Sequence, residues 1–408
     1  MSQTLPPGRI RIRMTARPID EPHRTASPLE LLFDLTFVVA VAAVTAQLAH
    51  DIADGHGVDG LVPFLQVFFA IWWAWMNFTW FASSYDTDDV LYRLLTMVQM
   101  AGVLVLAAGV PAAADHSDYR AVTIGYVIMR TGLVGHWLRA CAEDPDRRRT
   151  ALRYAVGVSA LQVLWLLRLL FTETGALPSS AQVPVFVALA ALELAVPLWA
   201  ERTARTTWHP HHIAERYGLF TLILLGESVL AATRGVSGAL EESEISSPFI
   251  IIAVSGLVIL FALWWLYFLV PAGQGLSDRR HLSYLWGYGH YGIFAGLAAL
   301  GAGLEVAVEQ TGHHVEASPT AICYAVAIPV GLVLTLLWLV HAPIVTERHI
   351  PSVALVLSVT VILLTPLLAP RLEVAAVLAA IATTCVLLTV VTITTRQRRP
   401  SRPDAPLA

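Results

Sequence analysis

The stretch FAIWWAWMNF, residues 69–78, decides the fold class because it lies in one of many long apolar runs. Apolar residues make up 56% of the 408 residues and charged residues only 14%, against about 45–50% and 25% in soluble domains. Runs of roughly 20 apolar residues alternate with short polar loops, and such a run spans the hydrocarbon core as a helix. Only helices and closed barrels can cross, because backbone groups find no water there. Since the runs show no alternating polarity, the sequence predicts an all-α, polytopic helical membrane protein.

The apolar runs predict about twelve membrane spans. The last two meet at a tight turn around Pro370, so that ten or eleven full crossings are alternatives. The predicted spans are 28–50, 59–82, 90–112, 118–140, 150–173, 181–200, 213–233, 248–271, 282–306, 319–341, 351–369 and 371–394.

The basic residues predict the orientation. All 26 are Arg, and with the N-terminus inside, 21 of them fall in cytoplasmic segments and helix ends. The outer side holds three, Arg120, Arg234 and Arg371, and two lie within spans, Arg130 and Arg168. Because cytoplasmic loops carry the excess of Arg, this asymmetry predicts an even number of spans with both termini in the cytoplasm. We expect Arg168 to snorkel or to pair near the outer face.

Lys is absent, and its absence excludes several chemistries. No Schiff base of retinal or pyridoxal can form, and no P-loop Lys can hold a nucleotide phosphate. The three cysteines, Cys141, Cys323 and Cys385, show neither a disulfide framework nor a zinc spacing. The sequence therefore predicts no cofactor and no metal site.

The apolar stretch of residues 69–78 recurs as FALWWLYFLV at residues 261–270, with Phe, Ala, Trp and Trp at the same places 192 residues apart. Outward from these two stretches, Glu30 aligns with Glu215, and QMAGVLVLAA at 99–108 aligns with HYGIFAGLAA. A duplicated unit with an even number of helices gives two parallel repeats related by an axis along the membrane normal. The sequence predicts two parallel six-helix repeats, with convergence of apolar composition as the alternative.

The predicted repeats divide the chain into two halves with polar segments around them. Residues 1–27 have no apolar core of a signal peptide and are expected to be a cytosolic tail. The predicted segments are a tail at 1–27, a first six-helix half at 28–200, a cytosolic linker at 201–212, a second half at 213–394 and a tail at 395–408.

Ionisable residues within spans are candidates for function, because one at the centre of a span costs about 2.5–3.5 kcal/mol. In SPLELLFD, Ser27 and Glu30 form a capping box, so Glu30 has a structural explanation. Asp34 lies one turn later on the same face, about 9 Å into the helix, where no cap explains it. It has either a functional role or a buried hydrogen bond.

The stretch HPHHIAERYGLFTLILLGES, residues 209–228, holds the strongest candidate, Glu227, about 18 Å along the helix from Glu215. His212 and Glu215 can share a face at the cytoplasmic start of this span, and Arg216 is expected to snorkel to lipid headgroups. The histidines lie in a loop rather than in a core, which disfavours a metal.

A buried Arg130 needs a carboxylate partner, and Glu227, Asp34 and Glu193 are the alternatives. We expect Asp34, Arg130 and Glu227 to form one polar site between the halves.

The loop SSYDTDDVLYR, residues 83–93, is acidic on the side where Arg is expected. Its three aspartates are interpreted as a solvated cap for the third helix. Alternatively, they attract cations or pair with Arg280 or Arg148.

Four stretches resemble the bacterial low temperature requirement A (LtrA) family over essentially the full length. They are LELLFDLTFV, WWAWMNFTWFASSYDTDDVLYRLL, LRACAEDPDRRRTALRYA and HHIAERYGLFTLILLGES. The resemblance implies a polytopic protein of the bacterial plasma membrane that is linked by name to growth at low temperature. It brings no established substrate and no catalytic residues.

Three classes of function are weighed. The first is a secondary transporter or related solute pathway, since duplicated halves with charged residues inside suit a site at a repeat interface. The second is a membrane sensory, lipid-binding or cofactor-binding protein, with a pocket lined by Trp72, Trp73, Trp264 and Trp265. The third is an intramembrane enzyme, which we do not expect because HExxH and similar motifs are absent. The expected partners are the lipid bilayer and a small solute or ion, and no nucleic acid, since the arginines follow topology.

Overall fold

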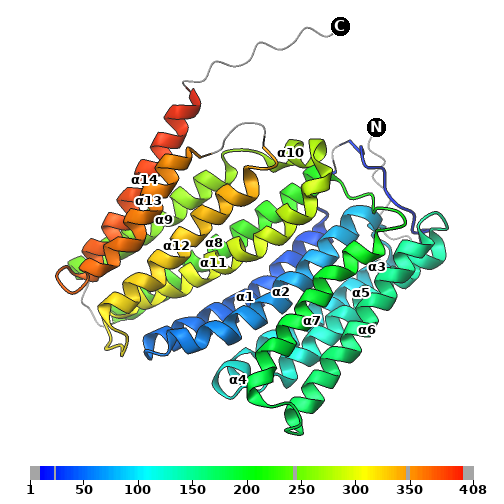
Figure 1. The fold of residues 1–408 in the computed structure, drawn as a ribbon, viewed down its shortest axis with the longest axis horizontal. Coiled ribbons are helices and arrows are strands. Elements are labelled where there is room, and N and C mark those ends of the chain that lie inside the picture. The colour runs from blue at the N-terminus through cyan, green and yellow to red at the C-terminus, as the bar shows by residue number, and fades with distance from the viewer. Residues whose placement is uncertain (1–9, 23, 242–245, 346–349, 398–408) are drawn as a thin grey trace. The chain divides into compact units, whose positions relative to one another are not determined.

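The computed structural model describes residues 10–22, 24–241, 246–345 and 350–397, and this part of the chain is helical without a β-strand. Figure 1 shows the course of the helices. Their bounds are α1 Pro28–Ala53, α2 Gly57–Tyr85, α3 Val90–Ala108, α4 Val110–Asp115, α5 Arg120–Glu143, α6 Arg148–Glu173, α7 Ser179–Ala200, α8 Pro210–Glu241, α9 Ser247–Phe268, α10 Ala272–Asp278, α11 Ser283–Glu309, α12 Pro319–His341, α13 Ser352–Leu364 and α14 Val374–Gln397, with short 3₁₀ turns at Arg280–Leu282 and Thr365–Leu368.

Side-chain caps explain where several of these helices begin. The Ser27 backbone N–H donates to Glu30 Oε2 at 2.7 Å and the Glu30 N–H donates to Ser27 Oγ at 3.3 Å, so the predicted capping box is confirmed. Asp89 caps α3 through the Tyr92 N–H, and Ser318 caps α12. Each cap satisfies a backbone donor that the first turn leaves without a partner.

Nine helical segments of the described chain are long and apolar enough to cross a membrane. All twelve predicted spans are helical, but α5, α8 and the segment Ser352–Leu368 are not among these nine. Arg130 and His136 lie in the middle of α5 and lower its mean hydropathy, Ser352–Leu368 is short, and part of α8 has side chains outside the described residues. The structure therefore supports a multi-pass helical membrane protein, and the count of twelve stays a prediction.

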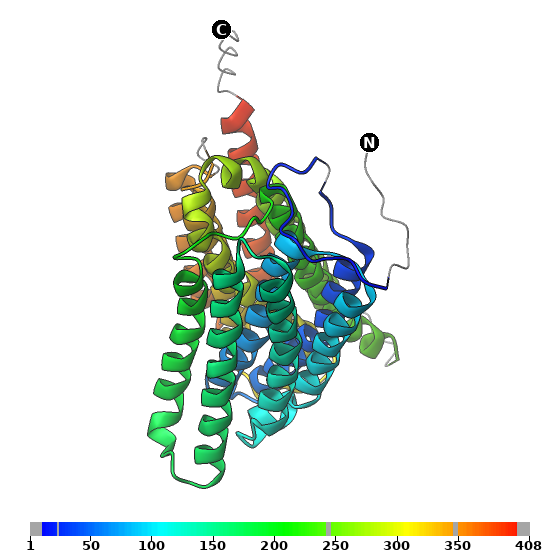
Figure 2. The same ribbon diagram turned by 90° about the vertical axis from the view of Figure 1, so that its right-hand side faces the viewer.

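The chain divides into two compact units. The first unit comprises residues 1–47 and 58–223, and the second comprises residues 48–57 and 224–408. Within the first unit, α3 packs on α5, α5 on α6 and α6 on α7. Figure 2 shows α6 and α7 as a hairpin. The core of this unit includes Trp72, Trp73 and Trp75 of α2, which are at most 1% exposed.

Small residues let α3 and α5 approach closely. A Cβ atom on Gly102 would lie 2.6 Å from the Gly125 carbonyl oxygen and 2.7 Å from the Met129 backbone nitrogen. Contact this close between backbones is typical of helix pairs in membranes, where packing replaces the hydrophobic effect. Neither glycine can therefore take a larger side chain without separating the two helices.

The N-terminal segment, residues 10–22 and 24–27, lies against the ends of the first unit's helices. Met14 is fully buried and its N–H donates to Glu143 Oε2 at 2.6 Å. The Ile12 N–H donates to Asp89 Oδ2 at 2.8 Å and the Arg17 N–H donates to the Ser84 carbonyl at 2.9 Å. This part of the predicted tail is thus a packed element of the unit.

Within the second unit, α11 packs on α12, α12 on α13, α13 on α14 and α14 on α9. His290 of α11 is fully buried there, and its ring nitrogen Nε2 lies 3.1 Å from the Tyr267 hydroxyl of α9. The buried ion pairs described below belong to the first unit.

Candidate functional site

The first group of buried charges, which we term the α1–α8 cluster, joins α1 and α8 within the first unit. Arg216 of α8 lies at its centre, with Nη1 2.9 Å from Glu30 Oε1 and Nη2 2.6 Å from Asp34 Oδ1. The side chains of Arg216 and Glu30 are 0% exposed and that of Asp34 is 3% exposed. Glu30 and Asp34 are one turn apart on α1, so a single guanidinium bridges both carboxylates.

Only one of the two carboxylate oxygens of Asp34 has hydrogen-bond partners among the described residues. Its Oδ1 accepts from Arg216 and from Trp75 Nε1, the latter at 2.7 Å. Its Oδ2 is buried and has no hydrogen-bond partner among the described residues. A carboxylate oxygen left without a donor is costly in a buried place. This oxygen is therefore an available acceptor for a proton, a cation or a polar group of a solute.

Glu30 serves both as a helix cap and as a member of the α1–α8 cluster. Besides Ser27 and Arg216, it contacts Arg24 at 3.3 Å and His212 Nε2 at 3.0 Å. His212 and Arg216 are one turn apart on α8 and both are fully buried, whereas Glu215 lies on the exposed side of the same helix. The predicted shared face of His212 and Glu215 is therefore wrong.

The prediction that Arg216 snorkels to lipid headgroups is also wrong. Its guanidinium is buried because Glu30 and Asp34 replace the hydration that it loses, which is the condition for burying a charge. The spacing held a signal for this arrangement, since His212, Arg216 and Phe220 recur every four residues, and Phe220 is also fully buried.

Asp86, in the loop between α2 and α3, extends the α1–α8 cluster. Its Oδ2 lies 3.5 Å from Arg24 and 3.6 Å from Arg17. Burial, together with the nearby negative charge of Glu30, raises the pKa of Asp86 to about 7 despite these two arginines. The cluster thus contains a carboxyl group that titrates near neutral pH.

We expect the contribution of Asp86 to the stability of the protein to fall as the pH rises from about 4 to about 7. In this window the folded protein holds a proton, because the pKa is raised to about 7, that the unfolded chain has released above its pKa of 3.8. The slope from this group is at most about 1.4 kcal/mol per pH unit. In thermal unfolding in detergent, the stability of Asp86→Asn relative to the wild type should therefore rise with pH across this window. Asp88→Asn, which removes an exposed neighbour, is the control, and equal slopes for the wild type and Asp86→Asn would contradict the assignment.

The other aspartates of this loop have separate partners. Asp89 caps α3 as predicted, but it is buried and bonded to Arg139 rather than solvated. Although burial opposes it, the hydrogen bonds from Arg139 and from the N–H groups of Ile12 and Tyr92 lower the pKa of Asp89 to about 2. Asp88 pairs with Arg93 at 2.8 Å. The structure gives these aspartates partners other than the predicted alternatives Arg148 and Arg280. The partners come from the N-terminal segment, α3 and α5.

The second group, which we term the Glu193 hub, joins four helices of the first unit. Glu193 of α7 is 1% exposed and accepts from five donors. The donors are Trp73 Nε1 of α2 at 2.9 Å, the Tyr126 hydroxyl and Arg130 Nη2 of α5 at 3.0 and 2.7 Å, and Gln162 Nε2 and Trp165 Nε1 of α6 at 3.3 and 3.2 Å. The two carboxylate oxygens of Glu193 offer about four lone-pair sites, and both oxygens accept from these donors.

Arg130 therefore pairs with Glu193, one of the three expected partners. The Arg130 guanidinium also lies 5.0 Å from the centre of the Tyr126 ring. Asp34 pairs with Arg216 instead, and Glu227 is buried in the part of α8 that belongs to the second unit. Asp34 and Arg130 were expected to share one polar site with Glu227. In the structure they form ion pairs in two separate networks of the first unit instead.

The four tryptophans proposed to line a pocket have different environments. Trp72 and Trp73 are 1% and 0% exposed, and Trp73 belongs to the Glu193 hub. Trp264 and Trp265 are 42% and 49% exposed on α9. The Trp pair is therefore buried in the first copy of the repeated phrase and exposed in the second. Among the described residues no group of three His, Cys, Asp or Glu side chains has the arrangement of a metal site.

Apolar helices that enclose two networks of buried charge define a multi-pass helical membrane protein with polar sites inside the bundle. The sequence matches the family described as bacterial low temperature requirement A protein (LtrA) over residues 25–392, and the chain belongs to this family. It is also similar to an uncharacterized protein of Rhizobium meliloti (strain 1021), with 27% identity over 291 residues that cover 67% of each chain.

Proposed function

We propose that this chain is a secondary transporter or a related solute pathway, associated with growth at low temperature as the description of its family suggests. The half-satisfied carboxylate of Asp34 carries the proposal. A buried acceptor beside a fixed guanidinium is suited to take up and release a proton or a cation. The Glu193 hub is the second buried polar network of the same unit.

A purely structural role accounts less well for these networks. Replacing a buried ion pair by apolar residues is often neutral or stabilising, so folding alone does not require these buried charges. Ionisable residues within membrane helices mark ion and solute pathways more often than they mark structural supports. We also propose that the chain is not an enzyme.

The order of helix neighbours supports the proposed parallel repeat. In the first unit the contacts run from α3 to α5, α6 and α7, and in the second unit they run from α11 to α12, α13 and α14. By sequence, α3 and α11 are the equivalent third helices of the two repeats. The same succession of neighbours is what a duplicated six-helix unit produces, and transporters of this type place their sites at repeat interfaces.

Asp34→Asn is expected to abolish ion-coupled uptake while the protein stays folded. The amide keeps an acceptor for Trp75 and Arg216 but cannot exchange a proton at neutral pH. The measurement is a screen of solute uptake by purified protein in liposomes under proton and sodium gradients. Asp54→Asn is the matched control, because Asp54 follows the same helix and its side chain is 55% exposed. Uptake by Asp34→Asn at the wild-type rate, or no uptake of any solute by the wild type, would contradict the proposal.

We also propose the bacterial plasma membrane as the location, with both termini in the cytoplasm, on the basis of the Arg asymmetry. In a Cys141→Ser background, His56→Cys and Ser180→Cys should react with an impermeant maleimide in intact cells. Asp146→Cys should react only after permeabilisation. The reverse pattern would invert the topology. Glu242, a further outer position by the prediction, lies outside the described residues.

A further inference from the structure

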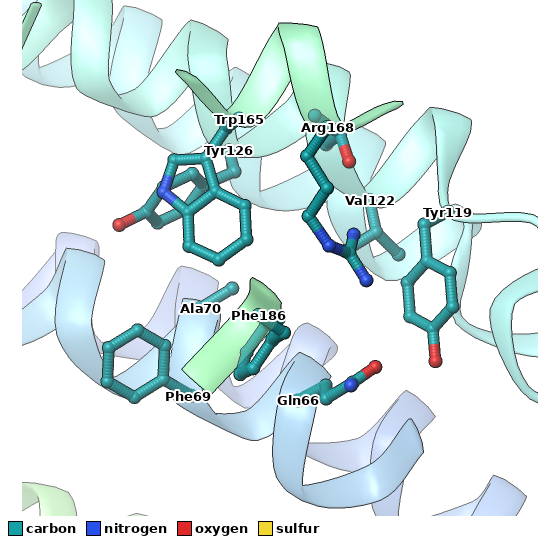
Figure 3. Close-up of a pocket in the computed structure, with 10 residues that line it drawn as sticks. Gln66, Phe69, Ala70, Tyr119, Val122, Tyr126, Trp165, Arg168 and Phe186 are labelled. Atoms are coloured by element: carbon teal, nitrogen blue, oxygen red, sulfur yellow. The ribbon is translucent and has the colours of Figure 1, made fainter. Parts of the chain in front are cut away.

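Arg168 of α6 is buried between aromatic rings, as Figure 3 shows. The residue as a whole is 7% exposed. The guanidinium carbon lies 5.6 Å from the centre of the Tyr119 ring, 5.9 Å from that of Trp165 and 5.7 Å from that of Phe186. The guanidinium lies over these rings at distances typical of cation–π contacts.

Arg168 differs from the other buried arginines of the first unit in having no carboxylate. Arg24, Arg130, Arg139 and Arg216 each have a carboxylate oxygen within 4 Å, in ion pairs with Glu30, Glu193, Asp89 and Asp34, respectively. No carboxylate in the described part of the chain lies within ion-pair distance of Arg168, and its buried Nε has no hydrogen-bond partner there. A desolvated cation without an anion is costly, so this site lacks a negative partner.

A cavity lies directly in front of the guanidinium. Its volume is about 30 Å³, which is more than the ~10–15 Å³ that one water molecule needs. The walls are mostly aromatic, with Gln66 and Thr123 as polar members. In Figure 3 the Arg168 guanidinium points into the space between Tyr119, Phe186 and Gln66. The N–H edges of the guanidinium are therefore directed at a site that can hold an acceptor.

We propose that this cavity binds the carboxylate group of a small organic acid, of the size of formate or acetate. The guanidinium presents parallel N–H groups that match the two oxygens of a carboxylate, whereas a spherical anion uses only part of this geometry. The aromatic walls accept the short apolar part of such an acid. Tyr126 and Trp165 line the cavity and also donate to Glu193, so the bound acid lies beside the Glu193 hub.

This binding is an equilibrium property and does not depend on transport. Acetate and formate, at constant ionic strength, should raise the melting temperature of the detergent-solubilised protein in a saturable way, as for any ligand that binds only the folded state. Chloride should have a markedly smaller effect. Arg168→Gln should weaken acetate binding at least about tenfold, and Arg168→Lys, which keeps the charge but loses the paired N–H groups, should weaken it to a lesser degree.

Arg153→Gln is the matched control. Arg153 lies on the same helix with its guanidinium 5.6 Å from the Trp199 ring, but it is partly exposed and donates to the Trp199 carbonyl. This variant should bind acetate as the wild type does. If Arg168→Gln fails to fold, two other results carry the test. The first is weaker acetate binding by Arg168→Lys. The second is a change in tryptophan fluorescence that acetate induces in the wild type and that is lost in Trp165→Phe. Equal stabilisation of the wild type and the Arg168 variants, equal effects of chloride and acetate, or stabilisation by phosphatidylglycerol but not by acetate would each overturn the proposal.

Discussion

Replacing Glu193 with Leu is expected to lower the free energy of unfolding by about 3–5 kcal/mol, because it leaves the buried Arg130 without its anion. The substitution also removes the acceptor of four neutral donors from α2, α5 and α6. Unpaired buried donors add their own desolvation penalties. Unfolding of the detergent-solubilised protein with increasing denaturing detergent measures the loss.

A double-mutant cycle separates the ion pair from the rest of the Glu193 hub. Arg130→Met combined with Glu193→Leu should be clearly more stable than the sum of the two single losses, since neither charge is then left alone. The matched control is the exposed pair of Asp88 and Arg93, whose side chains are each 44% exposed. Arg93→Leu should change the stability by less than about 1 kcal/mol. Additive losses in the buried cycle would show that Arg130 and Glu193 do not act as a pair.

Arg216→Met is expected to be at least as destabilising as Glu193→Leu, because it leaves two buried carboxylates, Glu30 and Asp34, without their shared cation. Arg216→Lys should recover only part of the loss, since one ammonium group cannot reproduce the two contacts made through separate nitrogens.

Thermal unfolding of both Arg216 variants provides the measurement, and Arg205→Met is the control on an exposed residue of the preceding loop. The control should change the stability by no more than about 0.5 kcal/mol. If Arg216→Met melts like the control, the contacts of Arg216 with α1 contribute nothing and the α1–α8 cluster is not a unit.

The helices and their starts could be predicted from the sequence because they follow local signals. Uncharged runs, the Ser27–Glu30 cap and the Asp89 cap all depend on neighbours within a few residues. The need of Arg130 for a carboxylate could also be predicted, since burial of a lone charge is unfavourable wherever it occurs. The choice of Glu193 among three candidates could not, because the partners are 63 residues apart and only helix packing brings them together.

The position of Arg216 was missed for a similar reason. A charge at the end of an apolar run is compatible both with exposure to headgroups and with burial against another helix. The decision depends on Glu30 and Asp34, which lie on a helix far away in the sequence. The burial of Asp86 and Asp89 likewise depends on the N-terminal segment, whose backbone hydrogen bonds leave no pattern in the sequence.

The separation between Asp34 and Arg216 also has a consequence for biosynthesis. The two residues are 182 positions apart, so a ribosome that adds about 5–20 residues per second completes Arg216 roughly 10–35 s after Asp34. Throughout that interval Asp34 of the nascent first helix lacks its cation, whereas Glu30 already has Arg24 six residues before it. We expect the first helix to keep Asp34 within reach of water until α8 has been made. The timing of translation and the lateral release of the first helix are therefore linked by a single guanidinium.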